Sequence, residues 1–183
     1  YVLYQGMEKG SFFFFMFLDL DNFKNVNDVY GHNTGDLVLK TIAKILTENA
    51  PDAYAIRLGG DEFVLLFKGI HSKESLCSIA QNIIDNISNK SYFLDINVYL
   101  SASIGLLYHE TVTESLDSIL AKSDMAMYYA KTHGKSQFIV FNDIAQSVFS
   151  EIEMEKSQQS SFDHNEFEIR YLPVISAQTS QLS

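Results

Sequence analysis

Residues that cross-link a chain, interrupt it or charge it positively are scarce in this sequence. It holds one cysteine and two prolines among 183 residues. The single cysteine, Cys77, excludes an internal disulfide and a cysteine-rich zinc site, and it agrees with the reducing cytoplasm that we expect for this segment. Lys and Arg number 13 against 23 acidic residues, so the formal net charge is −10. General nucleic-acid binders carry a basic stripe, and no nucleic-acid partner is therefore expected.

Long apolar runs are also missing. The longest, at residues 12–18, is too short to span a bilayer, and it lacks the charged lead and cleavage site of a signal peptide. It indicates a buried strand and no membrane contact by this segment, and it says nothing about an anchor elsewhere in a longer parent protein. What the chain has instead is 46% hydrophobic and 13% aromatic residues, which is the composition of a globular domain.

Hydrophobic spacing predicts both strands and helices. The predicted strands lie at residues 12–20, 54–58, 62–68, 92–107 (two strands with a break near Asp95) and 136–141. The predicted helices lie at 23–30, from a loop at 31–35 to about 49, at 72–88 and at about 113–132. The skeleton is βαββαβ, an α+β, ferredoxin-like arrangement with a central antiparallel sheet flanked by helices. In this arrangement the end of the first strand, at Asp19, faces the hairpin turn at Asp61.

Carboxylates stand at the ends of these neighbouring strands. Asp19 and Asp61, with Asp21 and Glu62 close by, would repel one another and raise one another's pKa unless a cation lay between them. A set of oxygen ligands without His or Cys favours Mg²⁺ or Mn²⁺. Mg²⁺ usually completes its shell with water and substrate phosphates, so the pattern points to a nucleoside triphosphate. Each acid taken alone is more often a solvated strand-end group.

Polar residues on the next two helices add candidates for ligand binding. Lys24 and Asn27 share one helix face, where the lysine could neutralise phosphate and the amide could recognise a base. Exposed helix residues with no ligand are an equal alternative. His32 and Asp36 flank the glycine-bracketed loop, and Asp36 could equally well interact with the positive N-terminus of the following helix.

Two lysines, Lys131 and Lys135, bracket the end of the last predicted helix. Thr113 or Ser115 is expected to cap the start of this helix, and Gly134 is expected to end it. By default the lysines offset the negative end of the helix dipole. The alternative is that they supply positive charge to a triphosphate.

Four ordered motifs resemble the GGDEF domain of bacterial diguanylate cyclases. The signature RLGGDEF is intact at 57–63, and 17–36 is similar to the family's other hallmark. Residues 101–105 and 130–135 resemble its later motifs, so that the resemblance covers about residues 1–143. It implies a fold of the nucleotidyl cyclase and polymerase-palm type. It also implies a homodimer that condenses two GTP into cyclic di-GMP and releases pyrophosphate, the 3′-hydroxyl of each GTP attacking the α-phosphorus of the other.

The resemblance also implies roles for particular residues. Asp19, the carbonyl of Leu20 and Asp61 would bind Mg²⁺ (or Mn²⁺). Asp61 is the candidate base for the 3′-hydroxyl, Glu62 supports the metal site, and Lys24 stabilises charge on the phosphates. Guanine would be contacted by Asn27 and Asp36, with His32 nearby. The triphosphate would be contacted by Lys131 and Lys135. The remaining substrate residues lie along the turn: Gly59, Gly60 and Arg57.

Three departures from the family pattern stand out. Lys135 and Ser136 replace the usual arginine and asparagine, which keeps the charge but loses the planar fork. Residues 50–53 lack the inhibitory Arg-x-x-Asp, so product inhibition at that site is not expected. The Leu-Thr-Gly-Leu segment before the family's first helix is missing, and we expect the chain to begin inside that helix at Tyr1.

The end of the chain has a different character. Residues 144–165 are expected to form a linker helix, and 166–183 resemble the opening strand of an EAL phosphodiesterase domain, here truncated. The catalytic Glu-Ala-Leu would lie beyond Ser183, so this fragment is not expected to hydrolyse cyclic di-GMP. This tandem context supports a rival hypothesis, a catalytically inactive GTP-binding domain that regulates the attached EAL phosphodiesterase. A purely structural dimerisation domain is a third hypothesis.

Overall fold

The computed structural model describes residues 13–67, 72–90, 99–109 and 115–145. The chain divides into two units, at 1–148 and 149–183, and all the described residues lie in the first. Its elements are β1 (Phe13–Asp21), α2 (Phe23–Tyr30), α3 (His32–Asn49), β2 (Ala53–Gly59), β3 (Glu62–Phe67), α4 (Lys73–Lys90), β4 (Ser101–His109), α5 (Leu116–Thr132) and β5 (Phe138–Val140).

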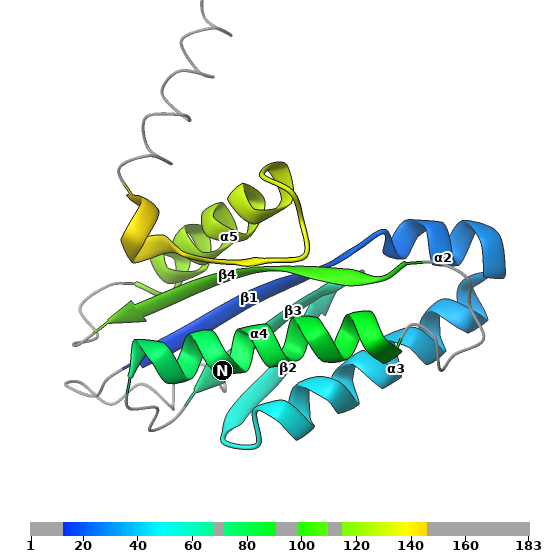
Figure 1. Ribbon diagram of the computed structural model, residues 1–183, viewed down its shortest axis with the longest axis horizontal. Coiled ribbons are helices and arrows are strands. Elements are labelled where there is room, and N and C mark those ends of the chain that lie inside the picture. Colours follow the sequence, from blue (N-terminus) through cyan, green and yellow to red (C-terminus); the bar gives the residue numbers. More distant parts are fainter. Residues whose placement is uncertain (1–12, 68–71, 91–98, 110–114, 146–183) are drawn as a thin grey trace, which may run out of the picture. The chain divides into compact units, whose positions relative to one another are not determined.

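The five strands form one sheet in the order β2-β3-β1-β4-β5 (Figure 1). The first three pairs in that order are antiparallel, as predicted, and β4 and β5 are parallel. A parallel pair needs a crossover connection, and α5 is that crossover. The predicted α+β, ferredoxin-like fold is thus confirmed, with a mixed sheet in place of a purely antiparallel one.

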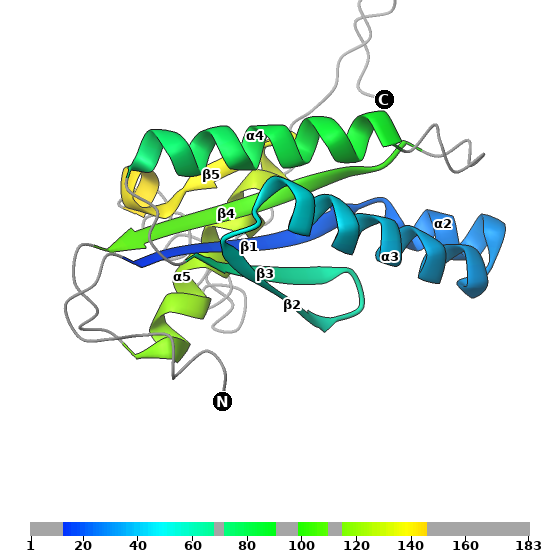
Figure 2. The ribbon, with the colours of Figure 1, turned by 90° about the horizontal axis from the view of Figure 1, so that it is seen from below.

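Helices cover both faces of the sheet. Helices α2, α3 and α4 pack on one face, and α5 packs on the other (Figures 1 and 2). Side chains alternate along β1, so Phe14 and Met16 join the first core and Phe15 and Phe17 join the second. The strand is therefore apolar on both sides, as the sequence predicted for a central strand. The same alternation carries Asp19 to the face that α5 covers.

The predicted loop at 31–35 is wrong, because α3 already begins at His32. Gly31 alone separates the two helices, with φ 81, a backbone conformation that glycine adopts readily. Gly35 lies inside α3 against α2, and a Cβ there would stand 2.0 Å from Asn27 Oδ1. The second glycine therefore permits close helix packing and does not mark a loop.

The C-terminal strand and the helix before it also differ in part from the prediction. Ser115 caps α5 by accepting a hydrogen bond from Ser118 N at 3.2 Å, whereas the other candidate, Thr113, lies outside the described residues. The predicted strand at 136–141 is shorter in the structure, because Ser136 has a left-handed φ of 48 before it and residues 141–145 are helical after it. The predicted strand residues 92–98 lie outside the described residues.

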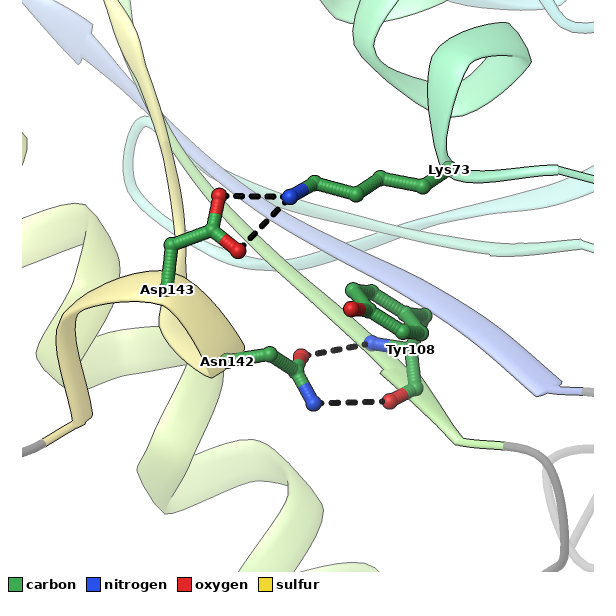
Figure 3. A network of polar contacts seen from close by, with 4 residues as sticks. All are labelled: Lys73, Tyr108, Asn142 and Asp143. Atoms are coloured by element: carbon green, nitrogen blue, oxygen red, sulfur yellow. Dashed lines mark hydrogen bonds and ion pairs between the residues drawn. The ribbon is translucent and has the colours of Figure 1, made fainter.

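Polar contacts tie the residues that follow β5 to the rest of the domain (Figure 3). Asn142 Nδ2 donates to Tyr108 O at 3.2 Å, and Tyr108 N donates to Asn142 Oδ1 at 3.3 Å. Beside them, Lys73 Nζ contacts both oxygens of Asp143 at 2.6 and 2.7 Å. None of the helices in the described part of the chain combines the length and apolar character that a bilayer-spanning helix needs.

Candidate active site

The site begins where β1 runs alongside the β2–β3 hairpin. Asp19 lies opposite Glu62 in the β1–β3 register, and Leu20 N donates to Asp61 O at 3.3 Å. Since the N–H and C=O of one residue point to the same side of an antiparallel strand, the Leu20 carbonyl also faces the hairpin. The predicted meeting of Asp19 with the hairpin turn is therefore seen in the structure.

The turn itself leaves room for a ligand. Gly60 has φ 51, and a Cβ added at Gly59 or Gly60 would meet nothing within 4 Å. Arg57 holds the turn in shape, because its Nε and Nη2 donate to Gly60 O at 3.0 and 2.7 Å. The arginine that was predicted to contact substrate is thus bonded to the backbone of the turn.

Asp19 is the electrostatic centre of the site. The residue is buried, at 5% exposure, and burial is the main reason that the pKa of its carboxyl rises from 3.8 to about 6. Lys131 lowers this pKa in part, while Asp61 and Glu62 raise it further. Lys131 Nζ lies 2.7 Å from Asp19 Oδ1. The two groups form an ion pair at this short distance, and among the described residues no other donor reaches this buried oxygen.

A divalent cation fits this set of groups. Across the described ranges, no three His, Cys, Asp or Glu side chains converge closely enough to hold a metal by themselves. Mg²⁺ does not need three, because it is usually bound by one or two carboxylates together with water and phosphate oxygens. Asp19 Oδ1 is buried and, among the described residues, meets one cationic group and no other donor, so it is the kind of oxygen that such an ion could bind.

The second acid of β1, Asp21, has quite different surroundings. It is 2% exposed, and its carboxylate accepts hydrogen bonds from Ser101 Oγ, Ser103 Oγ and Ser136 N at 2.7, 2.8 and 3.1 Å. Sequence reasoning placed Asp21 near the metal and gave it no role of its own. The alternation of Ser101 and Ser103 in an otherwise apolar strand was the signal that could have revealed these partners.

The end of α5 brings the two predicted lysines to this edge of the sheet. Gly134 follows the helix with φ 125, and Lys135 N donates to Ala130 O at 3.0 Å. Gln137 Nε2 donates to Ala130 O and to His133 O at 3.1 and 2.8 Å. These bonds satisfy the carbonyls of Ala130 and His133 at the end of the helix without a lysine side chain. The ammonium of Lys131 instead contacts Asp19, and Lys135 is exposed.

Of the predicted α2 and α3 residues, Asn27 lies where the two helices pack against each other. Asn27 is half-buried and its side chain lies against Gly35, the residue before Asp36. Lys24, His32 and Asp36 are exposed. The structure thus brings Asn27 near the start of α3, as base recognition by Asn27 and Asp36 would require.

A hollow of about 480 Å³ opens beside these residues, between α3 and the β2–β3 hairpin. Apolar side chains share its lining with charged ones: Leu39, Ala43, Ala55 and Phe63 with Asp36, Lys40, Thr47 and Arg57. Such a mixture suits a flat ring with a polar edge. Of the predicted substrate residues, Asp36 and Arg57 line the hollow, and the other predicted ones are not part of its lining.

Comparison with known proteins gives a consistent result. A family profile described as diguanylate cyclase, GGDEF domain, matches residues 2–137. The bifunctional diguanylate cyclase/cyclic di-GMP phosphodiesterase MucR of Pseudomonas aeruginosa is 30% identical over 176 residues, which are 94% of this chain and 25% of MucR. The cyclic di-GMP phosphodiesterase PdeR of Escherichia coli is 34% identical over 162 residues, 87% of this chain and 24% of PdeR.

Solved structures agree with the sequence matches. The GGDEF domain of DgcB from Caulobacter crescentus, in complex with c-di-GMP, has a TM-score of 0.65 and 26% identity, and covers 73% of this chain and 80% of its own. The chain spans about a quarter of the length of the curated relatives named above. Because the family profile matches well over half of the residues, the chain belongs to the GGDEF family of diguanylate cyclase domains.

Proposed function

We propose that this domain condenses two molecules of GTP into cyclic di-GMP and releases pyrophosphate. The observation that carries the proposal is the environment of Asp19. A buried carboxylate stands beside an open Gly-Gly turn, and among the described residues its Oδ1 is contacted by the Lys131 ammonium and by no other donor. Two carboxylates, a lysine and free backbone space suit a metal-bound triphosphate better than they suit a purely structural role.

The cation would be held by Asp19, Asp61 and the carbonyl of Leu20, with Glu62 in support. When bound, Mg²⁺ or Mn²⁺ supplies charge that stabilises the phosphate oxygens in the transition state. Lys131, Lys135 and Lys24 neutralise the triphosphate, and the Gly59-Gly60 turn lets it approach the backbone. Asn27, His32 and Asp36 orient the guanine, next to the hollow that Asp36 lines.

The reaction then needs one proton acceptor and two subunits. Asp61 is the group proposed to take the proton of the 3′-hydroxyl, because the turn presents it at the open edge of the site. The 3′-oxygen forms a bond to the α-phosphorus of the second GTP, and the bond from that phosphorus to the β-phosphate bridge breaks, so pyrophosphate leaves. A homodimer supplies the second GTP, and two such steps close the ring.

A regulatory role for the same site is the second candidate. It is favoured by the relative named as a phosphodiesterase and by Lys135 and Ser136 in place of the usual arginine and asparagine. We propose that residues 144–165 form a linker and that 166–183 begin an EAL domain, in line with the two activities in the name of MucR. In this alternative the domain binds GTP without turning it over, and the bound state controls the attached EAL phosphodiesterase.

Incubating the protein with GTP and Mg²⁺ separates the two candidates. A cyclase gives cyclic di-GMP and pyrophosphate, and Asp61→Ala abolishes the product. The exposed Asp52→Asn is the matched control and retains full turnover. Binding of GTP without product would favour the regulatory domain. Normal turnover by Asp61→Ala would refute the role of Asp61, and no GTP binding by the wild type would refute both candidates.

A further inference from the structure

We propose that Asp21 is a positioning residue that fixes the loop between α5 and β5, so that Lys131 and Lys135 face the triphosphate. That the ligand is GTP rests on the proposed function. The fixing of the loop is a claim about this chain's own contacts and can be tested without any ligand. The proposal gives the two acids of β1 different roles: Asp19 binds the cation, and Asp21 fixes the loop beside the site.

The contacts of Asp21 join three parts of the chain. Its Oδ1 accepts from Ser103 Oγ, and its Oδ2 accepts from Ser101 Oγ and from the backbone N–H of Ser136. The two serines belong to the start of β4, and Ser136 belongs to the loop that follows α5. A buried charge is tolerated when hydrogen bonds satisfy it, and here three donors surround one carboxylate.

The loop needs such an anchor because its backbone is unusual. Gly134, Lys135 and Ser136 follow one another with φ of 125, 61 and 48. Glycine adopts positive φ readily, but lysine and serine do so rarely. Such a backbone persists only where the surrounding contacts determine it. The bond from Ser136 N to Asp21 Oδ2 at 3.1 Å is a direct contact from this loop to the sheet.

The loop lies next to both lysines in the chain. Lys135 precedes the anchored residue, and Lys131 lies in the last turn of α5, one turn before the loop. The Lys131 ammonium already stands 2.7 Å from Asp19. Releasing Ser136 would free the loop from the end of β1 and change the direction of the Lys135 side chain relative to the site, while the Lys135 N–H stays bonded to Ala130 O in the helix cap.

A metal-binding role for Asp21 is the main alternative, since Asp21 lies two residues from Asp19 on the same face. The two acids differ in the number of hydrogen bonds that their carboxylates already accept. Among the described residues, the buried Oδ1 of Asp19 is contacted by the Lys131 ammonium alone, whereas both oxygens of Asp21 already accept hydrogen bonds. A cation at Asp21 would have to share this carboxylate with three donors that already bind it.

Two substitutions of Asp21 distinguish positioning from metal binding. Asp21→Asn keeps one oxygen for the Ser136 N–H, and its amide can donate to the Ser103 hydroxyl, which rotates to accept. Asp21→Ala removes every acceptor. For a positioning residue the asparagine variant is therefore close to wild type, whereas for a metal ligand it is nearly as damaging as alanine. Ser123→Ala is the matched control, because the hydroxyl of this buried serine donates within its own helix, to Ile119 O and Leu120 O.

The first measurement is hydrogen exchange of single backbone amides in the whole chain. We expect exchange at Ser136 to be at least about tenfold faster in Asp21→Ala, which is the exchange equivalent of about 1.4 kcal/mol. It should stay near wild type in Asp21→Asn and in the serine control. The Lys135 amide, which donates to Ala130 O within the helix cap, is the internal reference and should change little. Unchanged exchange at Ser136 in Asp21→Ala would overturn the proposal.

The second measurement is steady-state turnover, or the GTP dissociation constant if the wild type binds without turnover. Asp21→Ala should raise KM for GTP by about tenfold, with an unchanged Mg²⁺ concentration at half-saturation, and Asp21→Asn should restore KM. If Asp21→Asn matches Asp21→Ala and raises the Mg²⁺ requirement, Asp21 is a metal ligand and the proposal is refuted. If Asp21→Ala does not fold, Asp21→Asn alone still decides between the two. If the wild type binds no GTP, the proposed function fails, while the exchange comparison still decides whether Asp21 fixes the loop.

Discussion

Replacing Asp19 with asparagine should make the metal-free protein more stable at neutral and alkaline pH. Burial raises the pKa of this carboxyl from 3.8 to about 6, so the folded protein holds the proton more tightly than the unfolded chain does. The folded state then loses stability as the pH rises through about 4 to 6. Above that window the carboxylate is buried and charged, and an amide of the same shape avoids the penalty.

The size of the effect follows from the two pKa values. One pKa unit corresponds to 1.36 kcal/mol, so a rise from 3.8 to about 6 amounts to about 3 kcal/mol at about pH 8. This value already includes the favourable contact with Lys131, whose side chain is 32% exposed and can turn to water when its partner is neutral. We therefore expect Asp19→Asn to raise the free energy of unfolding by about 2 to 3 kcal/mol.

Urea unfolding of both proteins in a chelating buffer measures this difference. At about pH 8 the gain should be full, and it should shrink to about 1 kcal/mol near pH 4.5, because most of the folded Asp19 is then protonated. Asp28→Asn, at an exposed position of α2, is the control and should change stability by less than about 0.5 kcal/mol at either pH. A variant that is no more stable than the wild type at about pH 8 would refute the reasoning.

Two further predictions concern packing and the end of the domain. A Cβ at Gly105 would stand 1.9 Å from the backbone oxygen of Ser123, so Gly105→Ala should lower the free energy of unfolding by about 3 kcal/mol or more. Gly59→Ala, where a Cβ would meet nothing, should change it little, and equal losses in thermal melts would contradict this account. Asn142→Ala removes two hydrogen bonds to Tyr108 and should destabilise by about 1 to 2 kcal/mol. Lys73→Ala breaks an exposed ion pair and should lower the free energy of unfolding by less than about 1 kcal/mol. A larger loss in Lys73→Ala than in Asn142→Ala would show that the ion pair holds this segment.

Local patterns in the sequence were sufficient for most of the fold. The apolar run before Asp19 predicted a central strand, and Gly59-Gly60 predicted a hairpin, because both signals lie within a few neighbouring residues. The prediction of a loop at 31–35 was wrong because it also relied on a local pattern. Gly35 was interpreted from the preference of glycine for loops, whereas a glycine is needed there because Asn27 of the neighbouring helix lies too close for a Cβ. No local pattern in the sequence contains that contact.

The site was predictable only as far as topology alone could place it. Asp19 and Asp61 were expected to meet because a ferredoxin-like order puts the first strand beside the hairpin. The partners of Asp21 lie at sequence separations of 80, 82 and 115 residues. Finding them needs the β1–β4 register and the path of the chain after α5. The approach of Lys131 to Asp19 likewise depends on which face of the sheet α5 covers.

The two acids of β1 show why this edge of the sheet combines stability with chemistry. They lie on the same face and are both buried, yet Asp21 accepts hydrogen bonds from three donors, while the Oδ1 of Asp19 is contacted, among the described residues, by the Lys131 ammonium alone. A group that is fully satisfied has little to gain from a ligand, and a group left unsatisfied gains much. Asparagine should therefore have opposite effects at the two positions. At Asp19 it should raise stability and abolish GTP binding in the presence of Mg²⁺, and at Asp21 it should leave that binding nearly intact.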